Sequence, residues 1–181
     1  MLPMTTEATR HVMQANKGKD TKPELKVCAA LREAGLSGYR LHWKKSPGHP
    51  DVCYPGRKVA IFVNGCFWHR CPYCDLPRPK SNVEYWDAKF ARNRERDARE
   101  QELLVADGWK VLVVWEHALK GDRFEATVEE LADIVGSTPR GVPHPGEVLE
   151  VGEHARGGEG SRGDVVADAA GPEDGDGVLV G

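Results

Sequence analysis

No apolar run in the sequence is long enough to cross a lipid bilayer. Stretches such as residues 59–63 and 111–115 contain five residues each, whereas a membrane-spanning helix needs roughly 20. Residues 1–20 also lack the apolar centre of a secretory signal peptide. These absences argue against a protein with a membrane-spanning helix, so we expect a cytoplasmic protein with no membrane partner.

The cysteine pattern of a disulfide-stabilised secreted domain is also missing. The chain has five cysteines, an odd number, and three of them lie within nine residues at Cys66, Cys71 and Cys74. A disulfide framework would spread its cysteines along the chain. A reduced compartment and a bound metal ion therefore fit this pattern better.

Aromatic residues and cysteines are absent from residues 140–181, which hold 11 of the 20 glycines and nine acidic residues against three arginines. Such a segment buries too little apolar surface to offset the entropy of ordering it. We therefore expect an N-terminal arm (1–18), a folded domain (19–136) and an acidic, glycine-rich disordered tail (137–181). Residues 1–139 hold 22 Lys and Arg against 19 Asp and Glu, a small positive surplus that is compatible with a phosphate-bearing partner.

Local patterns predict an α/β fold. A helix begins after Thr21, a suitable N-cap with Glu24 at the capping-box position, and ends near Ala34. The elements expected after it are strands at 39–44, 51–54 and 58–64, a long charged helix at 82–107, a strand at 109–115 and a helix at 124–135. The first three strands resemble an antiparallel meander, and VLVV in the fourth is typical of a strand covered on both faces. This order indicates one mixed central sheet flanked by helices.

Cys66, Cys71 and Cys74 are spaced so that their thiolates can share one metal ion. We expect His117 to be the fourth ligand, because it follows the last predicted strand and adjacent strands would bring it near the cysteines. His69, inside the cysteine loop, is the alternative. Three thiolates and one imidazole form a closed tetrahedral site typical of structural zinc. Free, partly buried thiols are the interpretation without a metal.

Asp51 stands at the start of a predicted strand, where a charge is costly unless it binds a metal or joins a hydrogen-bond network. A turn cap is the alternative role. The neighbouring strand delivers Val63, Asn64 and then His69 to the same edge of the sheet. Asp51 as a magnesium ligand, with His69 as general acid or base, would suffice for phosphodiester hydrolysis. Glu24 can hold a water at the metal, or serve only as the capping acid of its helix.

Two further features are typical of DNA binding. Phe67 and Trp68 are consecutive in the cysteine loop, with Trp86 at the start of the long helix, and we expect part of this aromatic surface to be exposed rather than all of it in the core. A basic stripe at helical spacing begins one turn later and comprises Lys89, Arg92, Asn93 and Arg96. Such a stripe is often only a solvated face, but beside the aromatic residues it favours contact with phosphates.

Five segments closely resemble the very short patch repair (Vsr) mismatch endonucleases, in order: KDTKPE (19–24), PGHPD (47–51), IFVNGCFWH (61–69), residues 86–97 and GWKVLVVWE (108–116). The likeness spans about residues 8–135. It implies a variant of the type II restriction endonuclease fold, in the PD-(D/E)xK superfamily. It also implies an enzyme that nicks one DNA strand 5′ to the thymine of a T:G mismatch, the product of 5-methylcytosine deamination.

The resemblance implies a role for several residues of this chain. Asp51 corresponds to the magnesium ligand, His69 to the catalytic histidine and Glu24 to a supporting acid. The aromatic residues implied to wedge beside the mismatch are Phe67, Trp68 and Trp86, and Met13 in the N-terminal arm matches a position that enters the DNA from the other groove.

The chain departs from the family pattern at two places. Val63 and Asn64 replace a common Thr-His pair; the backbone carbonyl of Val63 can still bind magnesium, whereas Asn64, at a catalytic position, cannot carry a proton as an imidazole would. The usual metal ligands Cys, His, Cys, Cys are rearranged here as Cys66, Cys71, Cys74 and His117. The second acid and lysine of the restriction-fold signature are missing, as they are in the resembled family.

The sequence therefore predicts a zinc-stabilised, magnesium-dependent endonuclease that acts at T:G mismatches in double-stranded DNA. The expected protein is a monomer located at the nucleoid, with mismatch-repair proteins as possible partners. Two alternatives stay open: a related endonuclease of restriction type or with another mismatch preference, and a zinc-stabilised DNA-binding module that does not cut.

Overall fold

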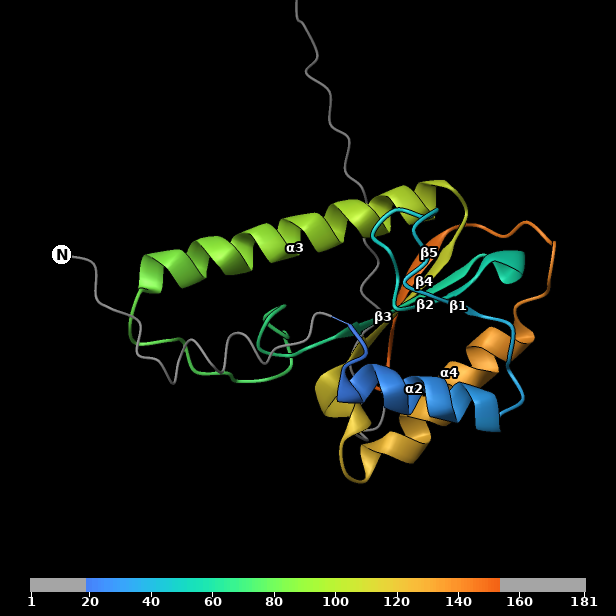
Figure 1. The fold of residues 1–181 in the computed structure, drawn as a ribbon, viewed down its shortest axis with the longest axis horizontal. Helices are drawn as coiled ribbons and strands as arrows, with labels where there is room; N and C mark the ends of the chain where they lie inside the picture. Colours follow the sequence, from blue (N-terminus) through green and yellow to red (C-terminus); the bar gives the residue numbers. More distant parts are fainter. Residues whose placement is uncertain (1–18, 154–181) are drawn as a thin grey trace, which may run out of the picture.

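The structure is a computed structural model that describes residues 19–153. The predicted N-terminal arm, including Met13, and residues 154–181 lie outside the described residues. Three α-helices and a five-stranded mixed sheet form the described part (Figure 1). No helix in residues 19–153 has the length and apolar character to span a membrane.

The helices and strands follow the order that the sequence predicts, with one additional strand, β5, at the end. The elements are α2 (Lys22–Glu33), β1 (Arg40–Leu41), β2 (Val52–Tyr54), the 3-10 turn η1 (Pro55–Arg57), β3 (Val59–Asn64), α3 (Val83–Ala106), β4 (Lys110–Trp115), the 3-10 turn η2 (Glu116–Leu119), α4 (Arg123–Ser137) and β5 (Glu147–Val151). The sheet order is β1-β2-β3-β4-β5. β1, β2 and β3 pair antiparallel, as the predicted meander requires, and β3, β4 and β5 pair parallel.

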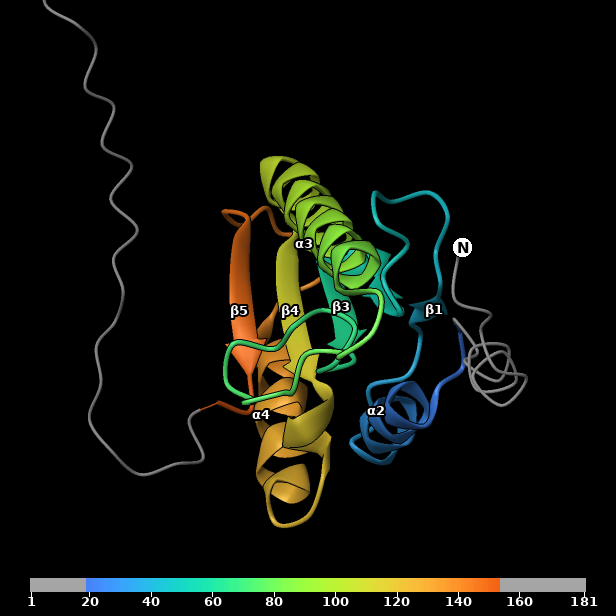
Figure 2. The same ribbon diagram turned by 90° about the vertical axis from the view of Figure 1, so that its left-hand side faces the viewer.

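The sheet is covered on both faces, which confirms the interpretation of the VLVV segment. Leu112 and Val114 of β4 pack with α2 and α4, whereas Val111 and Val113 point to the opposite face, toward Leu104 of α3. Figure 2 shows α3 on one side of the strands and α2 with α4 on the other. The alternation of side chains along a strand thus builds two separate apolar layers from one short segment.

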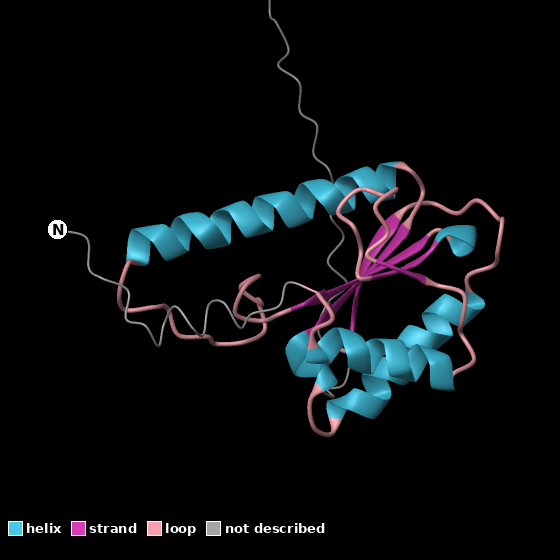
Figure 3. Ribbon diagram, viewed as in Figure 1, coloured by secondary structure: helices cyan, strands magenta, loops and turns pink. Residues whose placement is uncertain are grey.

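Helix α3 extends well beyond the sheet, on the side where the loop after β3 lies (Figure 3). Only Phe90 and Leu104 of its 24 residues are buried. The helix is therefore largely a surface element, and its projecting half is held by the loop rather than by the sheet.

Two sequence predictions differ from the structure. The strand expected at 39–44 shortens to β1, because His42 adopts a left-handed backbone conformation with φ of 45° that interrupts the extended chain. The disordered tail expected from residue 137 does not hold for Glu147–Val151, which form β5. β5 gains its order from parallel pairing with β4, a long-range contact that the local composition does not reveal.

Candidate active site and metal centre

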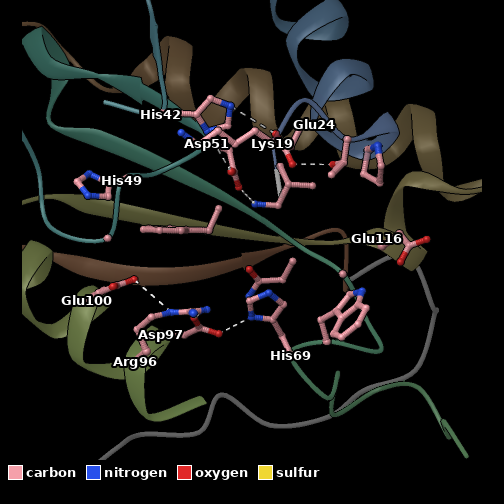
Figure 4. Close-up of a pocket in the computed structure, with 18 of the residues that line it drawn as sticks. Lys19, Glu24, His42, His49, Asp51, His69, Arg96, Asp97, Glu100 and Glu116 are labelled. Atoms are coloured by element: carbon pink, nitrogen blue, oxygen red, sulfur yellow. Dashed lines mark hydrogen bonds and ion pairs between the residues drawn. The ribbon is translucent and has the colours of Figure 1, made fainter. Parts of the chain in front are cut away.

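A cleft of about 890 Å³ opens at the carboxyl end of β3 (Figure 4). Its walls come from the start of α2, the loop before β2, the end of β3 with the loop after it, and α3. The tight turn before β2 requires glycine: Gly48 has φ of +71°, and a Cβ atom there would lie 2.9 Å from the Glu100 side chain. Close contact between this turn and α3 closes one wall of the cleft.

Asp51 and the end of β3 present oxygen atoms to the cleft. The Asp51 Oδ2 atom accepts a hydrogen bond of 2.8 Å from the backbone N–H of Val63. Extending the β2–β3 register places Val63 opposite Pro50, and proline has no N–H to donate to the Val63 carbonyl. In an antiparallel strand the N–H and C=O of one residue point to the same side, so the Val63 carbonyl lies on the same side as Asp51. Pro50 cannot donate a hydrogen bond to this carbonyl. The two oxygens can therefore bind one hard cation.

Burial makes the charge on Asp51 costly. Burial is the largest cause of a net rise in the pKa of Asp51 from 3.8 to about 6; the hydrogen bond from Val63 opposes the rise, and nearby Glu24 adds to it. His42 and His69 lower the pKa of Asp51 by smaller amounts. A carboxylate that is hard to ionise alone is well suited to a divalent cation, because the cation would stabilise the ionised form.

Glu24 and His42 lie beside Asp51. Glu24 is only 8% exposed, and it accepts hydrogen bonds from the Thr21 hydroxyl at 2.6 Å and from the Asp20 N–H at 2.9 Å. The Nε2 atom of His42 lies 3.7 Å from Glu24, and its Nδ1 atom lies 3.8 Å from Asp51. Glu24 thus stabilises the start of α2 and also faces the cleft, so its two predicted roles are compatible.

His69 is oriented by α3. Its Nδ1 atom is hydrogen-bonded to Asp97, and its backbone N–H donates to the Gly65 carbonyl at 3.1 Å. Burial alone would raise the pKa of Asp97, but the contacts with His69 and Arg96 outweigh it and hold that pKa below its ordinary value. The ionised carboxylate fixes one ring nitrogen of His69 and leaves the other, Nε2, available for proton transfer.

Asn64 ends β3, lines the same cleft and is 8% exposed. An amide side chain can donate and accept hydrogen bonds but cannot exchange a proton near neutral pH. The imidazoles that line the cleft are those of His42, His49 and His69.

An aromatic cluster stands at one end of the cleft and comprises Phe67, Trp68, Trp86 and Phe90. The Phe67 ring lies 5.2, 5.7 and 5.4 Å from the other three rings. Phe90 is buried and anchors the cluster to α3, whereas the other three are half-buried. Part of this aromatic surface is therefore exposed, as the sequence predicted.

The basic stripe on α3 leads from a surface groove into the cleft. All four of its residues line a groove of about 560 Å³, and Lys89 and Arg96 also line the cleft. The Lys89 ammonium lies 5.1 Å from the centre of the Trp68 ring, a cation–π contact. Asn93 donates a hydrogen bond of 2.9 Å to the Trp68 carbonyl, so its amide holds the loop against the helix.

The predicted zinc ligands lie together, the cysteines in the loop after β3 and His117 in η2 after β4. The ligand atoms of Cys66, Cys71, Cys74 and His117 are all within 4.8 Å of one another. The Nδ1 atom of His117 is 3.3 Å from the Cys66 sulfur and 3.5 Å from the Cys71 sulfur. Tetrahedral zinc–sulfur and zinc–nitrogen bonds of ordinary length would separate these atoms by about 3.5 Å. The cluster therefore fits a closed metal site, and His69 belongs to the cleft instead.

Comparison with known proteins identifies the family. Residues 3–74 match the family model described as DNA mismatch endonuclease Vsr. The chain is 40% identical over 133 residues to the type II nicking enzyme V.XorIIP of Xanthomonas oryzae pv. oryzae, a match that covers 72% of this chain and 96% of the relative. This chain belongs to the Vsr family.

Two other relatives agree with this assignment. The DNA mismatch endonuclease Vsr of Escherichia coli is 38% identical over 122 residues, which cover 67% of this chain and 76% of that protein. The type II nicking enzyme V.NaeI of Lentzea aerocolonigenes is 42% identical over 125 residues, which cover 66% of this chain and 74% of that enzyme. Vsr membership places the chain among the DNA endonucleases. It also implies a restriction-endonuclease-like fold, with which the mixed sheet agrees, and a divalent metal.

Sequence reasoning found part of this Vsr site and missed part of it. The structure brings Asp51, Glu24 and His69 into one cleft, as expected. It adds His42 and Asp97, which the sequence analysis did not single out. His42 lies in a segment with a strand-like pattern, and Asp97 lies next to Arg96 of the basic stripe. The only feature of the sequence that could have indicated a role in the site for either residue is its place in or near a segment that resembles the family.

Proposed function

We propose that this chain is a magnesium-dependent, zinc-stabilised endonuclease that nicks one strand of double-stranded DNA 5′ to the thymine of a T:G mismatch. The observation that carries the proposal is the convergence of Asp51, Glu24 and a His69–Asp97 pair in one cleft of a Vsr-family chain. The proposed enzyme acts as a monomer, because a single-strand nick needs one active site. Its proposed location is the nucleoid, with mismatch-repair proteins as partners.

The cleft residues divide the chemistry between them. Asp51 and the Val63 carbonyl would hold magnesium, which when bound stabilises negative charge on the scissile phosphate. Glu24, fixed by two hydrogen bonds, positions an attacking water. His69 exchanges a proton through Nε2 while Asp97 holds its Nδ1 side. Asn64 contributes a hydrogen bond but no proton transfer, so His69 performs the acid–base role without a second imidazole at that position.

The DNA contacts follow from the surface next to the cleft. Phosphates of the duplex would lie along Lys89, Arg92 and Arg96, which would guide the backbone toward Asp51. The exposed edges of Phe67, Trp68 and Trp86 provide flat apolar surface that can insert beside a weakened base pair. Met13 would reach the mismatch from the opposite groove.

Cleavage of end-labelled duplexes tests this function directly. Two duplexes would differ only in one T:G versus T:A pair and be incubated with the purified protein, with and without added magnesium, and resolved on a denaturing gel. We expect a magnesium-dependent nick beside the mismatched thymine in one strand and no product with Asp51→Ala. Tight binding to the mismatch without any cut would contradict the proposal.

A related endonuclease with a different target is the second candidate. Both V.XorIIP and V.NaeI are named type II nicking enzymes rather than mismatch endonucleases, and Asn64 lines the cleft where the family resemblance expects histidine. Equal cleavage of the T:G and T:A duplexes would support this candidate.

A further inference from the structure

The last strand of the sheet brings a carboxylate to the metal centre. Val114 of β4 pairs with Val151 of β5, so the chain that leaves each strand continues at the same edge of the sheet. His117 follows β4 and Glu153 follows β5. The Nε2 atom of His117 and the Oε1 atom of Glu153 lie 2.9 Å apart, and both atoms are buried. Neither atom has a hydrogen-bond partner in residues 19–153, so each is buried with only the other as a close polar neighbour, at ion-pair distance rather than in an aligned hydrogen bond.

The contact decides which ring nitrogen of His117 carries the proton. A neutral imidazole has one N–H donor and one nitrogen lone pair. Were the lone pair on Nε2, it would face the negative Glu153 carboxylate, which is unfavourable. A proton on Nε2 pairs with the carboxylate and leaves the Nδ1 lone pair facing the sulfurs of Cys66 and Cys71. This is the form that can bind a metal ion.

Several contacts hold this end of the chain in place. Gly152 has φ of +89°, and a Cβ atom there would lie 2.6 Å from Thr127 and 2.8 Å from Ala118, so only glycine allows this close approach. The Gly152 N–H donates a hydrogen bond of 2.9 Å to Glu130. Tyr73, between two of the cysteines, donates a hydrogen bond to Glu150. Glu153 therefore projects from a fixed backbone that also contacts the cysteine loop.

We infer that Glu153 is a positioning residue of the metal centre, whose carboxylate, 2.9 Å from Nε2 of His117, stabilises the proton on that nitrogen and so directs Nδ1 at Cys66, Cys71 and Cys74. The strand that composition assigned to a disordered tail is thereby part of the metal site. The inference does not depend on which DNA the chain cuts, because the quantity that tests it is metal affinity.

Zinc affinity of the full-length protein, measured by competition with a chromophoric chelator, tests the inference. Loss of such a carboxylate typically weakens metal binding about 10- to 100-fold, and we expect this for Glu153→Ala. Glu153→Gln keeps an acceptor but not the charge, so its loss should be smaller, about 3- to 10-fold. Glu147→Ala is the matched control: Glu147 lies at the other end of β5, paired with Lys110 at 2.9 Å, and its affinity should stay within about twofold of wild type.

Cobalt(II) substitution provides an independent readout. The wild-type protein should show thiolate-to-cobalt charge-transfer absorption, and the spectrum of Glu153→Ala should change as His117 loses its orientation. Unchanged zinc affinity in Glu153→Ala would overturn the inference, as would a wild-type protein with no thiolate-to-cobalt band. If the alanine variant does not fold, unchanged affinity in Glu153→Gln overturns it instead.

Discussion

Replacing Asp51 by asparagine should inactivate the protein and also stabilise its magnesium-free fold. The Asp51 side chain is 23% exposed, and burial raises its pKa from 3.8 to about 6. A difference of about two pKa units between the folded and unfolded chains corresponds to about 3 kcal/mol. The substituted amide would be neutral and nearly isosteric, and its oxygen can still accept a hydrogen bond from the Val63 N–H. Because an amide imitates a protonated carboxyl imperfectly, we expect a gain of about 2 kcal/mol at pH 7.5.

The sign of the effect depends on pH. The folded-state pKa of Asp51 lies above the unfolded value, so the folded chain holds the proton more tightly. The contribution of Asp51 to stability is therefore most favourable below about pH 4, becomes less favourable as the pH rises to about 6, and carries the full penalty above that. The advantage of Asp51→Asn should shrink to about a third of its neutral value at pH 4.5.

Thermal unfolding followed by circular dichroism measures this difference. The buffer should lack magnesium but contain no chelator, since a chelator would also remove an ion from the cysteine cluster. A gain of about 2 kcal/mol predicts a melting temperature about 4–8 °C higher at pH 7.5. Glu129→Gln, at an exposed position of α4, should change it little. A variant that melts at or below the wild-type temperature at pH 7.5, or whose advantage is the same at pH 4.5, would refute the reasoning.

The remaining predictions concern proton transfer, packing and the metal. In single-turnover assays, His69→Ala should slow nicking roughly 10²- to 10⁴-fold, and Asp97→Asn should slow it at least tenfold but less than His69→Ala. An unchanged rate in Asp97→Asn would exclude a role for the His69–Asp97 pair. Because the pKa of Asp97 is lowered in the fold, its ionised form stabilises the protein above about pH 4, so wild type should lose stability relative to Asp97→Asn below that pH in urea titrations. Gly152→Ala should destabilise the fold by about 2–4 kcal/mol, since its Cβ atom would lie 2.6 Å from Thr127; wild-type stability would show that this end of the chain is loose. Removing the bound metal with a strong chelator should unravel residues 65–74 and abolish nicking even after magnesium is restored, and full activity in verified zinc-free protein would contradict this.

The elements that could be predicted from the sequence are those whose signals are local. Thr21 and Glu24 mark the start of α2, and the VLVV run of β4 indicates burial on both faces. β5 lacks such a signal, because its EVLEV sequence is neither a continuous apolar run nor a strict alternation of polar and apolar residues, and it lies within a glycine-rich, acidic region. The segment gains its order from long-range contacts, above all its register with β4, and register is a property of the assembled sheet.

The same distinction applies to the site. Asp51 and His69 could be predicted because Asp51 directly precedes one strand and His69 lies in the loop that follows the neighbouring strand, so the topology brings both to one edge of the sheet. The partnership of His69 with Asp97 joins residues 28 positions apart, and it depends on how α3 lies across the loop. His42 lies beside Asp51 because the antiparallel β1–β2 register continues to this pair, and the His42 N–H donates a hydrogen bond of 3.2 Å to the Asp51 carbonyl. Neither contact has a sequence spacing that would reveal it.

Because few residues of α3 are buried, its exposed residues can change during evolution without loss of the fold. Because only Phe90 and Leu104 are buried in this long helix, most of its surface can change at a cost of roughly 0.5 kcal/mol or less per substitution. The proposed cation ligands lie at the start of β2 and near the end of β3, outside this helix. Apart from Asp97, which contacts His69, the exposed residues of α3 can therefore change by successive exchanges while the proposed cation ligands stay constant.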